Sequence, residues 1–339
     1  MNSFERVYAS FENKNRDRVP IIPHIGDHAG AIFGVSCNKM YKDPQVAAKV
    51  HLKALELYDY DITTIQVEPS WAVAEACGSH VIYPSDKSPW ISSHVVEKKA
   101  DLERLEIPDF QEIISTNTMI EGTRILSENA KAPVAAYMTG PLTFSLQLMP
   151  YEKAISEMMK NPEFFHNLIR RSTKIIRSYV ELLKEVGATI FIICEHDIQL
   201  ISPLLFKKFS LAYLEHLLDI FHYNILHLCG DIQVHLKENS DFLKKFKNLN
   251  MVNIGPKVDI AWAQKTFDKK LGIAGNIDHM RLVPQGSPRE IQDEVHKAIE
   301  ASQGDNRFIL TPGCEITVDT PKENVKALVN GIRTYKKHV

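Results

Sequence analysis

Short apolar runs, many rich in β-branched residues, recur along the chain and are separated by longer segments with a helical period. Eight runs have the length of a buried strand: VPIIPHIG (19–26), DITTIQV (61–67), PVAAYMTG (133–140), ATIFIICEHD (188–197), NILHLCG (224–230), NMVNIGP (250–256), KLGIAGNID (270–278) and RFILTPG (307–313). Most intervening segments place apolar residues three and four apart, as in 44–58, 162–187, 203–221, 289–304 and 321–337. This alternation predicts an α/β fold with a parallel sheet. Eight such units predict a single-domain (β/α)8 TIM barrel over residues 1–339.

The alternative α/β architecture, a doubly wound open sheet, would carry a phosphate-binding glycine turn after its first strand. The glycines of PHIGDHAGAIFG lie at 26, 30 and 34, which is not the G-x-G-x-x-G spacing. Between the second and third strands, residues 79–102 contain two alternating runs separated by Pro, Ser and Asp. This pattern predicts a β-hairpin excursion from the barrel.

Composition narrows the class of partner. The 339 residues are 44% hydrophobic and 24% charged, with 40 Lys and Arg against 42 Asp and Glu and no basic stripe, so nucleic acid is not an expected partner. The charged N-terminus lacks a signal peptide's apolar core, and no run is long enough to span a bilayer. We therefore expect a cytoplasmic protein without membrane contact. Five cysteines in a chain of this length do not indicate a disulfide framework.

The chemistry-bearing pattern is ILHLCGD (225–231). His227 and Cys229 are two apart in a strand, so they project to one face, and Gly230 marks the strand's carboxyl end, where barrel active sites lie. Cys314 follows the eighth strand. One imidazole and two thiolates fill three of zinc's four tetrahedral positions and leave one open, as in catalytic sites. The alternative is a buried histidine with small buried cysteines; Cys37, Cys77 and Cys194 are interpreted in that way.

The segments HLCGD (227–231) and LTPGCEITVDTPKENVKALV (310–329) resemble the uroporphyrinogen decarboxylase superfamily, specifically its methyltransferase branch, which includes methylcobalamin:coenzyme M methyltransferases. ENKNRDRVPIIP (12–23), AYMTGPLTFS (136–145) and LISPLLFKKFSLAYL (200–214) extend the similarity over nearly the whole chain. The resemblance implies a (β/α)8 barrel and Zn2+ held by the histidine and the two cysteines. It also implies a corrinoid (cobalamin) carried by a separate protein that docks at the barrel mouth.

Two departures from the family pattern refine this expectation. The decarboxylases hold their carboxylate-rich substrate with an arginine-rich segment near the first strand, whereas residues 23–30 contain no arginine. Members that act on coenzyme M tend to carry a glutamate on the sixth strand that serves as a fourth zinc ligand. Here Asn253 to Pro256 replace it. The fourth position is thus left to water, to substrate or to a carboxylate such as Glu195 or Asp197.

Residues after the early strands complete the predicted site. Glu195, His196 and Asp197 follow the fourth strand and are predicted catalytic groups. The predicted substrate-binding residues follow the first three strands: His24, Asp27, His28, Phe33, Gln66, Glu68, Trp71, Gln147 and Met149. Their aromatic and thioether character favours a methoxylated aromatic donor (O-demethylation) over a thiol acceptor such as coenzyme M. The remaining alternatives are a metal-free decarboxylase acting on a small acid and a non-enzymatic corrinoid- or tetrapyrrole-binding protein.

Overall fold

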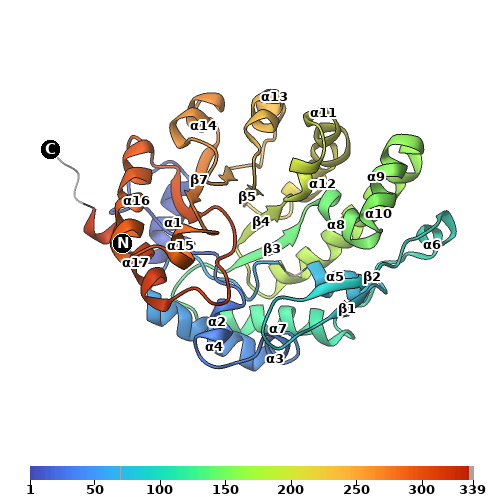
Figure 1. Ribbon diagram of the computed structural model, residues 1–339, viewed down its shortest axis with the longest axis horizontal. Coiled ribbons are helices and arrows are strands. Elements are labelled where there is room, and N and C mark those ends of the chain that lie inside the picture. Colours follow the sequence, from blue (N-terminus) through green and yellow to red (C-terminus); the bar gives the residue numbers. More distant parts are fainter. Residues whose placement is uncertain (69, 336–339) are drawn as a thin grey trace.

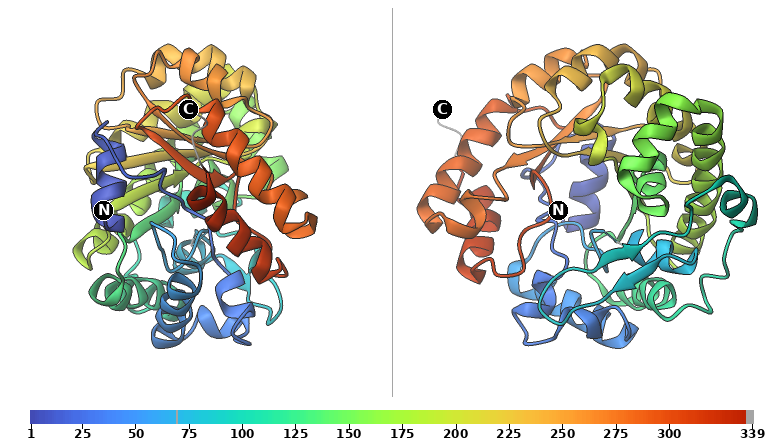
Figure 2. Two further views of the ribbon diagram at one scale, coloured as in Figure 1. Left: turned by 90° about the vertical axis from the view of Figure 1, so that its left-hand side faces the viewer. Right: turned by 45° about the vertical axis from the view of Figure 1, so that its right-hand side comes forward.

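The computed structural model describes residues 1–68 and 70–335 and forms a barrel of parallel strands surrounded by helices (Figures 1 and 2). Six strands pair in chain order, each parallel to the next. They are β3 (Ala135–Thr139), β4 (Ile190–Cys194), β5 (Tyr223–Leu228), β6 (Met251–Ile254), β7 (Gly272–Ile277) and β8 (Phe308–Pro312). The predicted strands from the third to the eighth are therefore confirmed.

The first two predicted strands close the barrel through single bridges rather than as regular strands. Ile21 pairs with Leu310 of β8, and Thr63 pairs with Val134 just before β3. Pro20 and Pro23 flank the first bridge and have no N–H to donate to a ladder. After the second, the Thr64 hydroxyl turns to the backbone of Gln66, at 3.1 Å from its carbonyl oxygen. The sequence pattern placed both segments correctly and overestimated their regularity.

Helices follow the strands and cover the outside of the barrel (Figure 2). Their bounds are α1 (Ser3–Phe11), α2 (His28–Ala31), α3 (Cys37–Met40), α4 (Pro44–Tyr58), α5 (Ser70–Ala76), α6 (Lys99–Arg104), α7 (Ile114–Asn129), α8 (Pro141–Leu148), α9 (Tyr151–Lys160), α10 (Pro162–Glu185), η1 (Asp197–Leu200), α11 (Pro203–Phe206), η2 (Lys207–Leu211), α12 (Ala212–Leu218), α13 (Gln233–Leu243), α14 (Ile260–Thr266), α15 (Leu282–Gln285), α16 (Pro288–Ala301) and α17 (Lys322–Thr334). Among the described residues, none of these helices has both the length and the apolar character needed to cross a membrane.

The predicted hairpin excursion is confirmed. The antiparallel strands β1 (His80–Ile82) and β2 (Trp90–Ser93) lie outside the barrel sheet, beside α5, and lead to the projecting helix α6 (Figure 1). The loop between them returns to the barrel, because Ser88 donates a hydrogen bond to the buried Asp27 at 2.6 Å.

Buried side chains from alternate strand positions fill the barrel interior, as expected for a packed (β/α)8 core. The interior cluster includes Ile22, Ile62, Ala135, Tyr137, Ile190, Ile192, Ile225, Met251, Ala274 and Ile309. At the amino ends of the strands, Arg6 of α1 (2.7 Å) and Arg18 of the segment that follows it (2.6 Å) form ion pairs with the fully buried Asp61. The open mouth is therefore at the carboxyl ends of the strands.

Candidate metal centre

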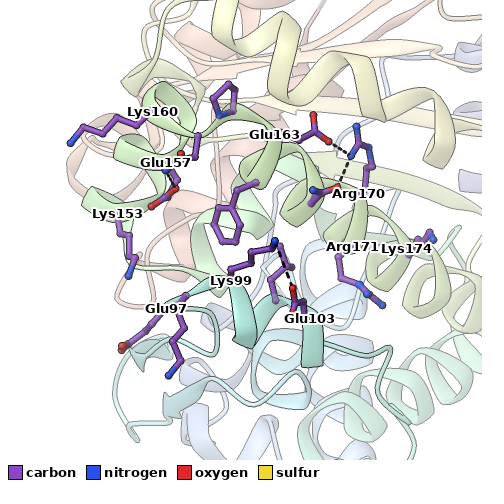
Figure 3. Close-up of a pocket in the computed structure, with 16 residues that line it drawn as sticks. Glu97, Lys99, Glu103, Lys153, Glu157, Lys160, Glu163, Arg170, Arg171 and Lys174 are labelled. Carbon is purple, nitrogen blue, oxygen red and sulfur yellow. Dashed lines mark hydrogen bonds and ion pairs between the residues drawn. The ribbon is translucent and has the colours of Figure 1, made fainter.

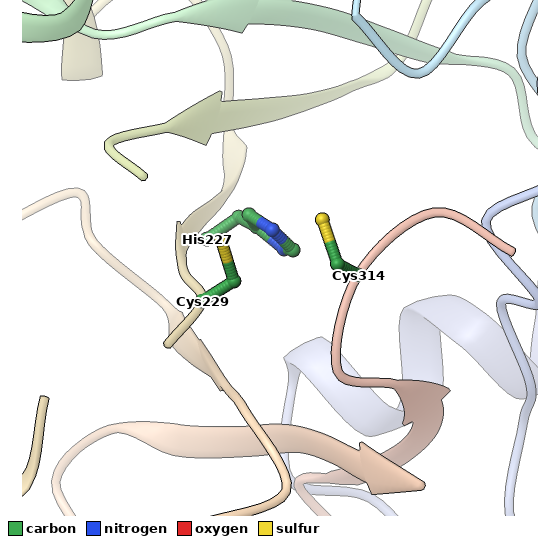
Figure 4. A group of neighbouring side chains, drawn as sticks. All are labelled: His227, Cys229 and Cys314. Atoms are coloured by element: carbon green, nitrogen blue, oxygen red, sulfur yellow. The ribbon is translucent and has the colours of Figure 1, made fainter. Parts of the chain in front are cut away.

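Three side chains that offer soft or imidazole ligands meet at the mouth. One ligand atom from each of His227, Cys229 and Cys314 lies within 4.8 Å of the other two. The first two come from the end of β5, and Cys314 from the loop after β8 (Figure 4). Zn–N and Zn–S bonds of roughly 2.0–2.3 Å at tetrahedral angles separate ligand atoms by about 3.4–3.8 Å. The cluster therefore fits a zinc ion after a small contraction, and nitrogen with two sulfurs is a donor set that zinc favours.

The two thiols influence one another. A hydrogen bond from Cys314 lowers the pKa of the Cys229 thiol against the opposing effect of burial. The same hydrogen bond and burial raise the pKa of Cys314. Cys229 is therefore the more acidic of the two thiols, and thiolates are the form that binds metal.

Glycines allow the ligand loops to approach. Gly230, directly after Cys229, has φ +92°, and a Cβ there would lie 2.3 Å from Gln199 Oε1. A Cβ on Gly313, directly before Cys314, would lie 2.4 Å from Pro256 Cδ. Both ligands are therefore placed by turns in which a side chain would collide with the neighbouring loop.

Two buried residues, Asn253 and His24, contact the ring of His227. Asn253 of β6 accepts a hydrogen bond at Oδ1 from His227 Nδ1. The His24 ring packs edge-on against His227 with centroids 5.5 Å apart, and His24 Nδ1 lies 2.6 Å from the Tyr137 hydroxyl. Burial, with His227 adding to it, holds the pKa of His24 well below its usual value, so this ring is neutral. The predicted substrate residue His24 thus lies in the barrel interior next to the candidate ligand.

Two predicted catalytic residues meet a predicted substrate residue. His196 Nε2 lies 3.3 Å from Glu68 Oε2, and His196 Nδ1 lies 3.5 Å from Asp197 Oδ2. Desolvation opposes a charge on His196, but the hydrogen bonds to the two carboxylates outweigh it and hold the pKa of His196 well above its usual value. An imidazolium is therefore available at the mouth near neutral pH.

Comparison with known proteins shows the family of this chain. The family model described as "Uroporphyrinogen decarboxylase (URO-D)" matches residues 2–335. The chain belongs to the uroporphyrinogen decarboxylase family. The methylcobamide:CoM methyltransferase MtaA of Methanosarcina barkeri is 24% identical over 346 residues, covering 96% of this chain and 95% of the relative. The uroporphyrinogen decarboxylase of Ruthia magnifica is 22% identical, covering 87% and 86%.

Solved structures confirm the (β/α)8 fold of this family member. A methyltransferase from Methanosarcina mazei superposes with a TM-score of 0.88 at 21% identity, covering 98% of each chain. A B12-independent methionine synthase from Shewanella sp. superposes with a TM-score of 0.53 at 14% identity, covering 84% of this chain and 86% of that one. At these identities the likeness concerns the fold alone.

Within this family member, Glu195 has contacts that favour a structural role over the predicted catalytic one. It is fully buried, and its carboxylate accepts hydrogen bonds from Leu142 N (3.0 Å), Thr143 N (2.8 Å) and Ser210 Oγ (2.7 Å). The two amides are the first free donors of α8, so Glu195 caps that helix, and burial raises the pKa of its carboxyl. Its bonding capacity is directed to the helix rather than to the mouth.

Asp27 and Gln66 lie together, as predicted, and adjoin a carboxyl that the sequence analysis did not identify. Gln66 Nε2 lies 3.4 Å from Asp27 Oδ1, and Glu315 Oε1 accepts the Asp27 backbone N–H at 3.1 Å. Burial first, then the Asp27 charge, raise the pKa of Glu315 well above its usual value. The signal for Glu315 was its position directly after Cys314, at the carboxyl end of a barrel strand.

Four other predicted substrate residues differ in exposure. His28 is buried between Tyr58 Oη (2.9 Å) and the Val318 carbonyl (3.4 Å), and Met149 is fully buried in the main core. Phe33 and Trp71 are half-buried and pack against that core. These contacts favour packing roles for all four.

Gln147 keeps an unpaired polar atom. It lies on α8, and its Oε1 is buried without a hydrogen-bond partner among the described residues. Of the predicted substrate residues after β3, Gln147 is thus the one with a free acceptor.

The other cysteines are free thiols. Cys37 and Cys194 are buried, as expected, and Cys77 is half-buried against the core. Burial raises the pKa of Cys194 well above its usual value, so this neighbour of the site is unreactive.

A groove of about 1090 Å3 lies between α6, α9 and α10, and shares no residue with the metal cluster (Figure 3). Acidic and basic side chains alternate in it. Arg170 pairs with Glu163 at 3.2 Å, and Lys99 with Glu103 at 4.0 Å. Such a mixture of charges is typical of a solvated surface. The groove is therefore not a competing candidate for the functional site.

Proposed function

We propose that this chain is a zinc-dependent methyltransferase that moves a methyl group between a small substrate and the cobalt of a corrinoid carried by a separate protein. The observation that carries the proposal is the meeting of His227, Cys229 and Cys314 at the carboxyl ends of β5 and β8. The cluster supplies three ligands and leaves a fourth position for substrate. A relative named as a methyltransferase matches nearly the whole chain, which supports methyl transfer over the other activities of the family.

The chain's own residues prepare the site for this transfer. Cys229 and Cys314 would supply thiolate ligands, and His227 would supply an imidazole nitrogen. When bound, zinc supplies Lewis acidity, which lowers the pKa of a thiol or stabilises the oxyanion left as a methyl group departs.

His196 can supply the proton that demethylation requires. Removal of the methyl group as a cation breaks the C–O bond and leaves both bonding electrons on oxygen, so the product needs one proton. The imidazolium of His196 carries that proton. The neutral ring then takes a new proton from solvent, and Glu68 and Asp197 favour this step by stabilising the imidazolium.

The type of polar group around the cluster favours a methoxylated aromatic donor over a sulfonated thiol such as coenzyme M. Asp27, Glu68 and Glu315 lie on the early loops and beside Cys314. None of these three carboxyl groups offers a sulfonate an ion-pair partner, and an uncharged methoxylated ring needs none.

The test is methyl transfer under anoxic conditions with purified zinc-loaded protein. We expect methylcobalamin to form from cob(I)alamin and a methoxylated benzene, and a corrinoid protein to accelerate the reaction. Thiol methylation from methylcobalamin without demethylation would reverse the preferred direction. Decarboxylation of an acid by zinc-free protein, with no methyl transfer, would contradict the proposal.

A further inference from the structure

Asn253 occupies the strand position next to the candidate ligand His227. The two residues are register partners in the parallel pair of β5 and β6, and both are buried, with exposed fractions of 1% and 3%. Asn253 stands where methyltransferase relatives were expected to offer a carboxylate to the metal. Its side chain instead contacts the far nitrogen of His227.

The orientation of the Asn253 amide is determined by its neighbours. Nδ2 lies 3.0 Å from the Ala274 carbonyl oxygen and 2.9 Å from Thr311 Oγ1. A carbonyl only accepts hydrogen bonds, so the nitrogen of the amide must face Ala274, and both of its hydrogens are used. Oδ1 therefore faces His227 and only accepts.

We infer that Asn253 is a positioning residue that fixes His227 as the tautomer with hydrogen on Nδ1 and a free electron pair on Nε2. An acceptor opposite Nδ1 requires a hydrogen there, which leaves Nε2 as the metal-binding nitrogen. The inference rests on the proposed zinc site. His24 packs edge-on against the same ring, with centroids 5.5 Å apart and an interplanar angle of 73°, and so adds a second buried contact to it.

The neutral amide also sets the charge of the centre. A carboxylate in this position would increase the basicity of the imidazole and add a negative charge. With Asn253, the two thiolates would balance a bound Zn2+, so the centre would be neutral before substrate binds. This arrangement preserves the electrophilic character that substrate activation needs.

The test compares Asn253→Leu, which removes the acceptor, with Asn253→Asp, which keeps an acceptor at the same distance. Zinc affinity is measured by competition with a chromophoric chelator. The tautomer is read in metal-free protein from the 15N shifts of labelled histidine, assigned by the signal lost in His227→Gln. We expect Asn253→Leu to raise the zinc Kd about 10- to 100-fold and to mix the tautomers, and Asn253→Asp, whose carboxylate still accepts from Nδ1, to raise the Kd by no more than about threefold.

Thr311→Val is the matched control, because it removes one partner of Nδ2 and leaves Oδ1 in place. It should weaken zinc binding less than Asn253→Leu does. If Asn253→Leu does not fold, Asn253→Ser, whose side chain is too short to reach Nδ1, replaces it with the same expectations.

Two results overturn the inference: folded Asn253→Leu with wild-type zinc affinity, or an unchanged Nδ1-protonated tautomer in that variant. Absence of zinc binding by the wild type would instead contradict the proposed function. In that case the tautomer of His227 in metal-free protein would still show whether Asn253 fixes the ring, independently of zinc.

Discussion

His196 lies between Glu68 and Asp197, and these carboxylates hold its pKa well above its usual value. We expect His196→Gln to lower kcat for demethylation about 100-fold, because the proton donor is lost, while zinc content stays unchanged. Wild-type activity should fall at alkaline pH, where the imidazolium deprotonates. Asp197→Asn removes one stabilising charge, so its alkaline limit should move to lower pH. Wild-type kcat in His196→Gln would exclude the proton-donor role.

His51 on α4 is buried, neither of its ring nitrogens has a hydrogen-bond partner within residues 1–68 and 70–335, and burial lowers its pKa to about 4. The unfolded chain, with a histidine pKa of about 6.5, binds more protons between these values, so stability is lost as pH falls from about 6.5 to 4, by about 3 kcal/mol in total. His51→Leu should remove this share of the acid sensitivity. Urea unfolding at several pH values measures it, with the exposed His222→Gln as control. An unchanged pH dependence in His51→Leu would contradict the assignment.

Among elements, α8 depends on Glu195, whose carboxylate meets two of its first backbone amides and Ser210. In Glu195→Gln an amide NH2 must face a donor, so we expect the free energy of unfolding to fall by about 2–3 kcal/mol. Ser210→Ala, which removes a single donor, should cost about 1 kcal/mol. Denaturant unfolding with parallel zinc analysis distinguishes the roles. A Glu195→Gln protein with wild-type stability and no activity would contradict the structural role and support the predicted catalytic role of Glu195.

The sequence predicted elements well where the apolar pattern was uninterrupted. Strands β3 to β8 and the hairpin lie where expected, because continuous apolar runs and a turn-rich segment each have one compatible conformation. The first two strands reduce to bridges, since prolines and a local hydroxyl contact replace ladder hydrogen bonds. The apolar pattern of a strand does not show whether its backbone groups bond to a neighbouring strand or to local side chains.

The same reasoning explains which site residues were found. His227 and Cys229 share a face by strand periodicity, and strand order brings Cys314 to them. The contact of Asn253 with His227 depends on the register between two strands, and the contact of Glu315 with Asp27 depends on loop geometry. Neither register nor loop geometry follows from spacing within one segment.

For the molecule as a whole, barrel closure is what turns separate segments into one centre. The ligands come from β5 and from the loop after β8, and Ile21 completes the ring by pairing with Leu310. The proposed zinc centre therefore requires that Cys229 and Cys314, although distant in the sequence, hold the same ion.

The measurement that tests this requirement most directly is zinc content by elemental analysis of the wild type, Cys229→Ser and Cys314→Ser. Cys77→Ser, a half-buried thiol outside the cluster, is the control. The account predicts about one zinc per chain in the wild type and the control and none in either ligand variant. Folded wild-type protein that stays zinc-free after reconstitution, or zinc retained in both ligand variants, would contradict it.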